Sequence, residues 1–441
     1  MASGTKNVEI HSDYFGVFTI ELKPVTGFVS HSLTIDEIQA EPDYVNAFNK
    51  ENLYHGSVHE HKIKMVDTDR SVTPQYEIGT LDSSYAAFYL GSTPSIFGLF
   101  HTDSITSYSI EPLYIYNNQR GDRRFLLRSS RPVEFQKKHY RPEPNRPESC
   151  RVRRDDRRYN RWRINNMGIT YAEECSRLDF LPTDLATKRS KYRSDEKYDK
   201  NTNVAPIHLH ISHTMYATTI KTRDVLPYLA TLMLPVYDGF RRSTFDSDDN
   251  NRPNVLLQLK HVTANHYAAD KELLKLTKSP FSINEYLMEK KMNKGVSGFA
   301  MTIHPTFNTQ DKSVKFAANP CSICNDDSTI VIMLNHCKEY NEPQEMWINS
   351  YYLMKAIGYQ LCSKDDRSRD NSEARCRTTY AMGSLSEYKY FVENPFSECS
   401  RKEIWSKLNS GGSKCFATPG SMHVPENDTK NIKYVSIAKC H

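Results

Sequence analysis

Alternating apolar and polar residues predict short β-strands in the first third of the chain. The segment 15–22, FGVFTIEL, alternates in this way and stops before Pro24 and Gly27. Further short runs follow, separated by Gly, Pro, Asn and Asp, at 86–90, 96–100, 105–116 and 124–127. Residues 1–135 are therefore expected to form a mainly β domain.

Apolar runs alternate with helical patterns in the second half. Strands are expected at 207–211, 254–261, 298–303 and 329–334, and helices at 222–238, 282–292 and 344–361. The last is the clearest helix, because Trp347, Tyr351, Met354 and Leu361 follow one stripe. This alternation predicts an α/β domain with a mixed or parallel sheet over 204–417.

A basic and proline-rich segment separates the two halves. Residues 137–163 contain eleven Lys and Arg against four acids, whereas the whole chain of 441 residues has a net charge of only +5. Such a segment could bind nucleic acid or another acidic surface. A linker is the better explanation, because the segment falls at an expected domain junction. Residues 136–203 are thus predicted to be a linker, and no nucleic-acid partner is expected.

Cysteine usage favours an oxidising compartment. Six of the ten cysteines fall in the last quarter of the chain, and Asn427 begins an N-x-T sequon. No window approaches the roughly 20 apolar residues that span a bilayer. The N-terminus has no apolar signal-peptide core, so the given sequence is expected to lack its true start. A secreted or extracellular location is predicted, with an intracellular one as the alternative.

The helix predicted at 344–361 has the spacing of a zinc-protease motif without its chemistry. In H-E-x-x-H-x-x-G-x-x-H, three histidines bind zinc, the glutamate activates a zinc-bound water, and the glycine ends the helix. Here Gly358 matches the glycine. Tyr351, Lys355 and Leu361 stand at the ligand positions and Tyr352 at the base position. A cation, an aliphatic side chain and a phenol with a pKa of about 10 are no substitutes at neutral pH.

Downstream motifs make a family resemblance specific. The sequence YAMG, which contains Met382, is followed by FSECS around Cys399 and, after a predicted helix, by Cys415. This pattern resembles the Met-turn and the cysteine-containing end of ADAM/reprolysin metalloprotease domains. The tail 418–441 lacks the cysteine pattern of a disintegrin domain.

The first half resembles the prodomain of the same family. Tyr108 and the sequence IEPL at 110–113 are closest to the tumour-necrosis-factor-α-converting-enzyme (TACE) branch. The resemblance extends from about residue 8 to 417. It implies a metzincin-like mixed sheet with helices, preceded by a mainly β prodomain-like domain.

The resemblance and the missing ligands together predict a catalytically inactive homologue without zinc. Its former cleft is expected to bind an extended peptide or protein by strand addition, and thereby to modulate ectodomain shedding. One alternative is an active metalloendopeptidase with a rebuilt site that uses His336 or His304. Another is an extracellular structural or interaction protein.

The resemblance also raises the question of processing. Arg151, Arg153 and Arg154 match the R-x-[KR]-R pattern that would separate a prodomain from a protease-like domain. Cleavage there is an open prediction that depends on secretion. Cys150 or Cys175 could correspond to the cysteine that caps zinc in ADAM prodomains, but an ordinary disulfide or free thiol is favoured for both.

Other candidate metal ligands are interpreted as structural. Cys321 and Cys324 form a C-x-x-C near His336 and Cys337, and disulfides with Cys362, Cys376 or Cys415 are favoured over zinc or redox chemistry. Two histidine groups are interpreted as structural or surface residues: His208, His210 and His213 on a strand, and His55, His59 and His61 in a polar loop without acidic partners.

Overall fold

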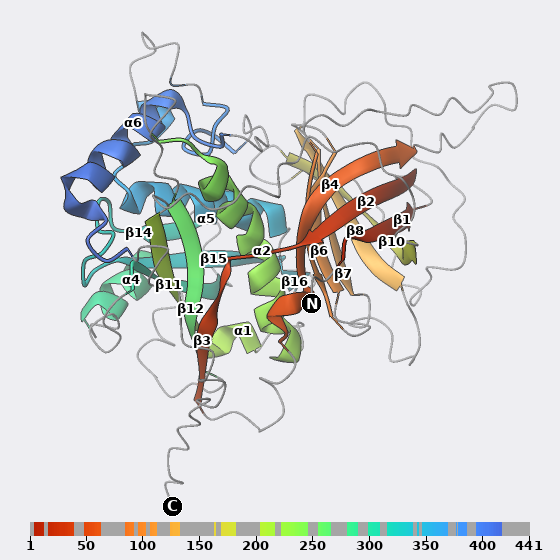
Figure 1. Ribbon diagram of the computed structural model, residues 1–441, viewed down its shortest axis with the longest axis horizontal. Helices are drawn as coiled ribbons and strands as arrows, with labels where there is room; N and C mark the ends of the chain where they lie inside the picture. Colours follow the sequence, from red (N-terminus) through yellow and green to blue (C-terminus); the bar gives the residue numbers. More distant parts are fainter. Residues whose placement is uncertain are drawn as a thin grey trace, which may run out of the picture. The chain divides into compact units, whose positions relative to one another are not determined.

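The computed structural model describes residues 4–12, 16–38, 48–62, 84–91, 96–102, 106–112, 124–132, 163–164, 169–181, 203–216, 222–245, 255–265, 280–289, 299–308, 315–337, 342–343, 346–368, 376, 378–385 and 394–416. The chain forms two compact units, and each is described by itself (Figure 1). At this level the expectation of an α/β chain with a mainly β first half is confirmed.

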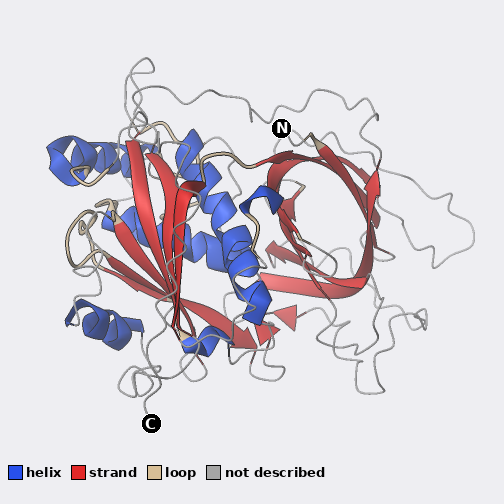
Figure 2. Ribbon diagram, turned by 60° about the horizontal axis from the view of Figure 1, so that its bottom comes forward, coloured by secondary structure: helices blue, strands red, loops and turns tan. Residues whose placement is uncertain are grey.

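The first unit is a closed antiparallel sheet. Its strand order is β1-β2-β4-β5-β6-β7-β8-β10-β9, and β10 also pairs with β1, so the sheet forms a ring (Figure 2). A closed sheet leaves no free edge between these strands. The strands are β1 (Lys6–Ser12), β2 (Gly16–Pro24), β4 (Leu53–Lys62), β5 (Tyr85–Leu90), β6 (Ile96–His101), β7 (Ser107–Pro112), β8 (Arg124–Pro132), β9 (Arg163–Ile164) and β10 (Ile169–Leu181).

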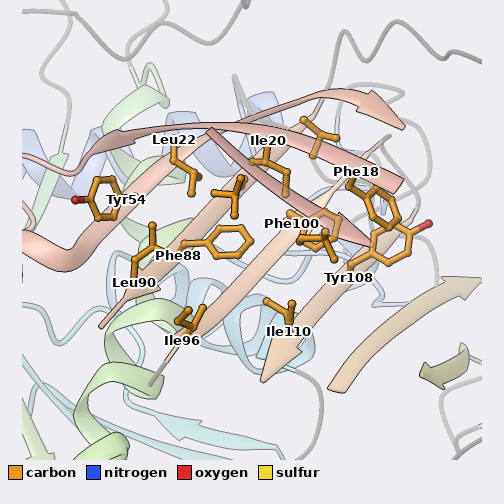
Figure 3. Close-up of a cluster of buried hydrophobic side chains, with 14 of the residues drawn as sticks. Phe18, Ile20, Leu22, Tyr54, Phe88, Leu90, Ile96, Phe100, Tyr108 and Ile110 are labelled. Carbon is orange, nitrogen blue, oxygen red and sulfur yellow. The ribbon is translucent and has the colours of Figure 1, made fainter. Parts of the chain in front are cut away.

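Inward-pointing side chains fill this ring with a hydrophobic core. Along β2, Phe18, Ile20 and Leu22 are fully buried at alternate positions, as the pleat of a strand requires. The ring of Phe18 lies 5.1 Å from that of Phe100 and 4.8 Å from that of Tyr108. Figure 3 shows these side chains converging from several strands. The alternation seen in the sequence is therefore the inner face of the sheet.

The predicted linker at 136–203 is partly wrong. Strand β10 lies within it and pairs with β8 over Ile169–Arg177 and with β1 over Ser176–Leu181. Its sequence is too polar to be recognised as a strand, but its backbone closes the ring between β8 and β1. Hydrogen bonding to two neighbours decides its structure, and this is invisible in a local pattern.

The second unit is a mostly parallel sheet. Its order is β14-β15-β13-β11-β12-β3, and every pair is parallel except β14 with β15. The end strand β14 is therefore antiparallel to the rest. The strands are β3 (Val29–Ile38), β11 (Asn203–Ile211), β12 (Val255–Asn265), β13 (Met301–Asn308), β14 (Phe316–Ala318) and β15 (Thr329–Cys337), and the short β16 (Glu342–Pro343) pairs with β15.

Helices cover this sheet. Ile330 to Leu334 of β15 are all buried, so both faces of this strand are covered. On one face, Val331 and Met333 pack against α4. The helices are α1 (His213–Tyr216), α2 (Thr222–Arg242), α4 (Pro280–Glu289), α5 (Met346–Gln360) and α6 (Glu398–Lys407), with short turns η2 (Lys50–Asn52), η7 (Asp366–Ser368) and η8 (Leu408–Gly412). None of the helices that the structure describes has the length and apolarity to cross a bilayer.

Strand β3 was assigned to the first domain from the sequence, and the structure corrects this. It pairs with β12 in the second sheet, although the strands before and after it, β2 and β4, pair with each other in the first. Phe28, next to β3, is fully buried, and its ring lies 5.3 Å from that of Tyr237 on α2. The domain boundary is therefore not a single point along the chain.

Candidate functional site

Helix α5 lies at the centre of the second unit, with almost every residue buried. It ends differently from the motif it resembles. Ser363 donates its backbone N–H to Gly358 O at 2.9 Å, and Cys362 donates to Tyr359 O at 3.0 Å, with Cys362 at φ 67°. This is the hydrogen-bond pattern of a helix end closed by one left-handed residue. Cys362 takes that position, where a glycine is more usual.

Gly358 has another role. A Cβ at this position would lie 2.5 Å from Met382 Sδ and 3.2 Å from the Phe396 ring. The glycine therefore lets the segment around Met382 approach the helix closely. The helix predicted at 344–361 is confirmed, since α5 runs from Met346 through Gly358 to Gln360.

Two of the predicted ligand positions converge on one backbone oxygen. Tyr351 donates its hydroxyl to Gly383 O at 2.8 Å, and Lys355 Nζ donates to the same oxygen at 2.6 Å. Both side chains are buried. The third position, Leu361, is fully buried and apolar. The structure thus brings together Tyr351, Lys355 and the turn that contains Met382.

Asp365 completes this cluster. Its carboxylate lies 2.9 Å from Lys355 Nζ, accepts a hydrogen bond from Tyr359 at 3.1 Å and is held by the Arg367 guanidinium at 2.9 Å. Burial acts to raise the pKa of Asp365, but the hydrogen bonds from Arg367 and Lys355 outweigh it and hold this pKa well below its usual range. Burial lowers the pKa of Lys355, and Asp365 opposes that shift.

Asp366, the next residue, ties the same turn to α6. Its backbone N–H donates to Met382 O at 3.0 Å. Its carboxylate accepts hydrogen bonds from Ser397 at 2.9 Å and Ser400 at 3.1 Å. Ser397 also caps the N-terminus of α6.

Sequence reasoning missed Asp365, Asp366 and Arg367. A signal for them existed, since a lysine on a helix that is apolar all round needs an acidic partner. Two acids follow the end of that helix within a few residues.

Tyr352, at the predicted base position, cannot act as a base at neutral pH. Burial raises its pKa to about 12. Its ring lies 5.2 Å from Tyr351 and 6.1 Å from Phe316 on the end strand β14. Phe316 also lies 5.8 Å from the ring of Tyr359. Tyr352, Tyr359 and Phe316 are only partly buried, so an aromatic surface joins α5 to the edge of the sheet.

Disulfides tie the loops around α5. Cys321 bonds Cys362, Cys324 bonds Cys415, and Cys376 bonds Cys399. The preference for disulfides at the C-x-x-C is confirmed. Of the three partners named for it, Cys362 and Cys415 bond to it, whereas Cys376 bonds Cys399. In the part of the chain that the structure describes, no group of three or more His, Cys, Asp or Glu could hold a metal ion.

No protein-family model and no curated protein matches this chain.

Several predicted sites lie outside the described residues. These are the processing residues Arg151, Arg153 and Arg154, the sequon at Asn427, Cys150 and most of the basic segment 137–163. Cys175 and His336 lie on β10 and β15, but their side chains are not among those described.

The first histidine group belongs to a buried polar face of the second sheet. His208 contacts the hydroxyls of Thr302 at 3.2 Å and Thr263 at 2.9 Å. His210 Nδ1 lies 2.7 Å from His304 Nδ1, and their rings stack. The structural interpretation of His208 and His210 is confirmed, while the side chain of His213 is not described. His304 is paired with His210 and does not replace a ligand near Lys355.

The second histidine group was placed wrongly. His55, His59 and His61 lie on strand β4 and not in a loop. His59 Nε2 also has an acidic partner, Glu21, at 2.7 Å. The strand was missed because its sequence, LYHGSVHEHK, is mostly polar. Its pairing with β2 and β5 decides its structure.

The buried histidines predict acid-sensitive stability. Burial lowers the pKa of His208 from 6.5 to about 3 and that of His210 to about 4. These groups stabilise the fold in their neutral form, so their contribution is complete above pH 6.5 and is lost as pH falls toward 4. Each should add up to about 1.4 kcal/mol of destabilisation per pH unit in that range. Chemical denaturation of wild type and His208→Gln between pH 7 and 4.5 measures this. Equal slopes in the two proteins would contradict it.

Proposed function

We propose that this chain is a catalytically inactive relative of the ADAM metalloproteases, nearest the TACE branch, whose second unit binds an extended peptide or protein. The observation that carries the proposal is the cluster of Lys355, Asp365 and Tyr351 at Gly383 O. An internal ion pair takes the place where the resemblance expects a zinc ion. At two of the ligand positions, Tyr351 and Lys355 bind the backbone of the turn that contains Met382.

The arrangement of the second unit supports the same proposal. The resemblance expects a mixed sheet with helices, a turn that contains Met382 and a cysteine-containing end with Cys399 and Cys415. The close approach of Met382 to Gly358 and the disulfides of Cys399 and Cys415 agree with this expectation. The disulfides are also compatible with a secreted protein.

The proposed binding surface is the edge strand β14 with the aromatic side chains beside it. An edge strand offers backbone N–H and C=O groups to an added strand, and this mode needs no metal. Phe316 and Tyr352 flank that edge and offer apolar contacts to alternate side chains of a peptide. Holding a protein segment without cutting it would make the chain a competitor of active shedding proteases.

Restoring the ligands tests the family assignment. Tyr351→His, Tyr352→Glu, Lys355→His and Leu361→His together should produce a protein with about one zinc per chain, because residues 351 and 355 already reach one common point. Wild type should contain much less than one zinc. Metal analysis of protein purified without a metal-affinity step measures both, and a variant that keeps Leu361 serves as control. Stoichiometric zinc in wild type, or none in the folded restored variant, would contradict the assignment.

A second experiment tests peptide binding. Peptides selected from a randomised library on the wild-type protein should bind at least tenfold more weakly to Tyr352→Ala and Phe316→Ala. The control is Phe281→Ala, since Phe281 is a 56% exposed aromatic on α4. Equal losses at all three positions, or no selected peptide at all, would favour the structural or interaction protein.

A further inference from the structure

Two strands pair in a sheet that is built mainly from the other half of the chain. Strand β3 precedes β4 to β8 of the first unit but belongs to the second sheet, whereas β10 follows the basic segment but belongs to the first. A backbone break between Pro132 and Arg163 interrupts no described strand. It would divide the chain into two fragments, each holding a strand that the other fragment's sheet contains.

Strand β3 is anchored in the second sheet by backbone and side chains. Leu259 donates its backbone N–H to Phe28 O at 2.7 Å, and the ladder continues from Thr34 opposite His261 to Ile38. Tyr237 donates its hydroxyl to Thr26 O at 2.5 Å and packs on the buried Phe28 ring. Thr34 Oγ1 lies 2.5 Å from His261 Nδ1. The N-terminal fragment would therefore keep a buried anchor in the C-terminal one.

Strand β10 is held on both sides. Ser176 is paired with Phe125 of β8 and also with Ser12 of β1. Removing β10 would open the ring and expose two unpaired strand edges, which costs backbone hydrogen bonds along both. The C-terminal fragment would therefore stay inserted in the sheet of the N-terminal one.

We propose that the two halves are interlocked by this reciprocal strand exchange, so that a chain cut between β8 and β9 remains a non-covalent complex of two fragments. Dissociation would require β3 to leave one sheet and β10 to leave the other, which is partial unfolding of both units. Each fragment thus binds the other through strand pairing. The second sheet takes up β3 beside β12, and the first takes up β10 between β8 and β1. This holds whatever the second unit binds.

A cleavable full-length chain tests the proposal. A recognition sequence for a site-specific protease is inserted after Phe135, with a different affinity tag on each terminus. After complete cutting, seen on a reducing denaturing gel, both fragments should elute together in size-exclusion chromatography and be captured together through the N-terminal tag after extensive dilution. Separate elution of the fragments would overturn the proposal. Residues 1–135 contain no cysteine, so no disulfide can hold the two fragments together.

Matched variants show which contacts hold the fragments. Phe28→Ala removes the anchor beside β3, and Ser176→Pro breaks the β10 ladders. In cut protein, the two together should speed fragment release at least tenfold over either alone, while His31→Ala, an exposed position on β3, leaves it unchanged. Release that is equally slow in the double variant would overturn the role of these strands. Uncut variants that elute as folded monomers exclude a general folding defect.

Discussion

Replacing Lys355 with Met is expected to destabilise the second unit by about 3 kcal/mol. The Lys355 ammonium is buried between Asp365 Oδ2 and Gly383 O, at 2.9 and 2.6 Å. Removing one partner of a buried pair leaves the other charge without compensation, which typically costs 3–5 kcal/mol. The lower end applies, because Arg367 still holds Asp365 and the carboxylate is partly accessible. Urea denaturation followed by tryptophan fluorescence measures the change.

The matched control is Arg367→Ala, which removes the other cation from the same carboxylate. The Arg367 side chain is 58% exposed, so its loss should cost less than about 1 kcal/mol. A double variant, Lys355→Met with Asp365→Leu, should recover much of the loss because no buried charge is left unpaired, and the Arg367 cation that loses its partner is 58% exposed. If Lys355→Met and Arg367→Ala lower the free energy of unfolding equally, the ion pair of Lys355 with Asp365 does not stabilise the fold as its burial indicates.

Replacing Met382 with Ala is expected to cost about 2–5 kcal/mol, the usual range for truncating a fully buried Met. The informative result is the response of Gly358. In the wild-type protein, Gly358→Ala should destabilise by about 1–3 kcal/mol, because the new Cβ would lie 2.5 Å from Met382 Sδ.

In the Met382→Ala background the sign should reverse. The Cβ then fills space that the methionine vacated, and alanine favours the helix by about 1 kcal/mol over glycine. Thermal denaturation of the four proteins of this cycle gives the interaction energy. Additive effects would mean that Gly358 and Met382 do not share one space. A control outside the contact is Gly239→Ala, whose Cβ would meet the flexible end of Met354 at 2.8 Å.

Burial makes Tyr351 and Lys355 poor positions for a test of ligand binding. Tyr351 and Lys355 stand at ligand positions of the motif, which makes them the first residues to mutate in a test of ligand binding. The structure buries both, at 2% and 5% exposure, with internal partners. Their substitution would alter stability first. The partly exposed Tyr352 and Phe316 are the better test of a ligand.

The pattern of apolar and polar residues was sufficient to predict the elements whose own residues strongly favour one kind of secondary structure. The apolar run at 329–334, the stripe along 344–361 and the alternation at 15–22 became β15, α5 and β2. The lack of histidine at positions 351, 355 and 361 was also legible in the residues, because metal binding depends on which side chains stand at the motif spacing.

The pairing of β3 and β10 and the partner of Lys355 were decided by the tertiary structure alone, because they depend on contacts between distant segments. Strand β10 looks like linker until β1 and β8 pair with it, and β3 looks like part of the first domain until β12 takes it into the second sheet. Lys355 looks like a lost ligand until Asp365 folds back from beyond the helix to pair with it. The sequence by itself determined which residues α5 carries at the motif spacing, whereas only the packing of the turn around Gly383 determined what they contact. A buried charge is stable only with a partner, and no local pattern shows which partner the fold will bring.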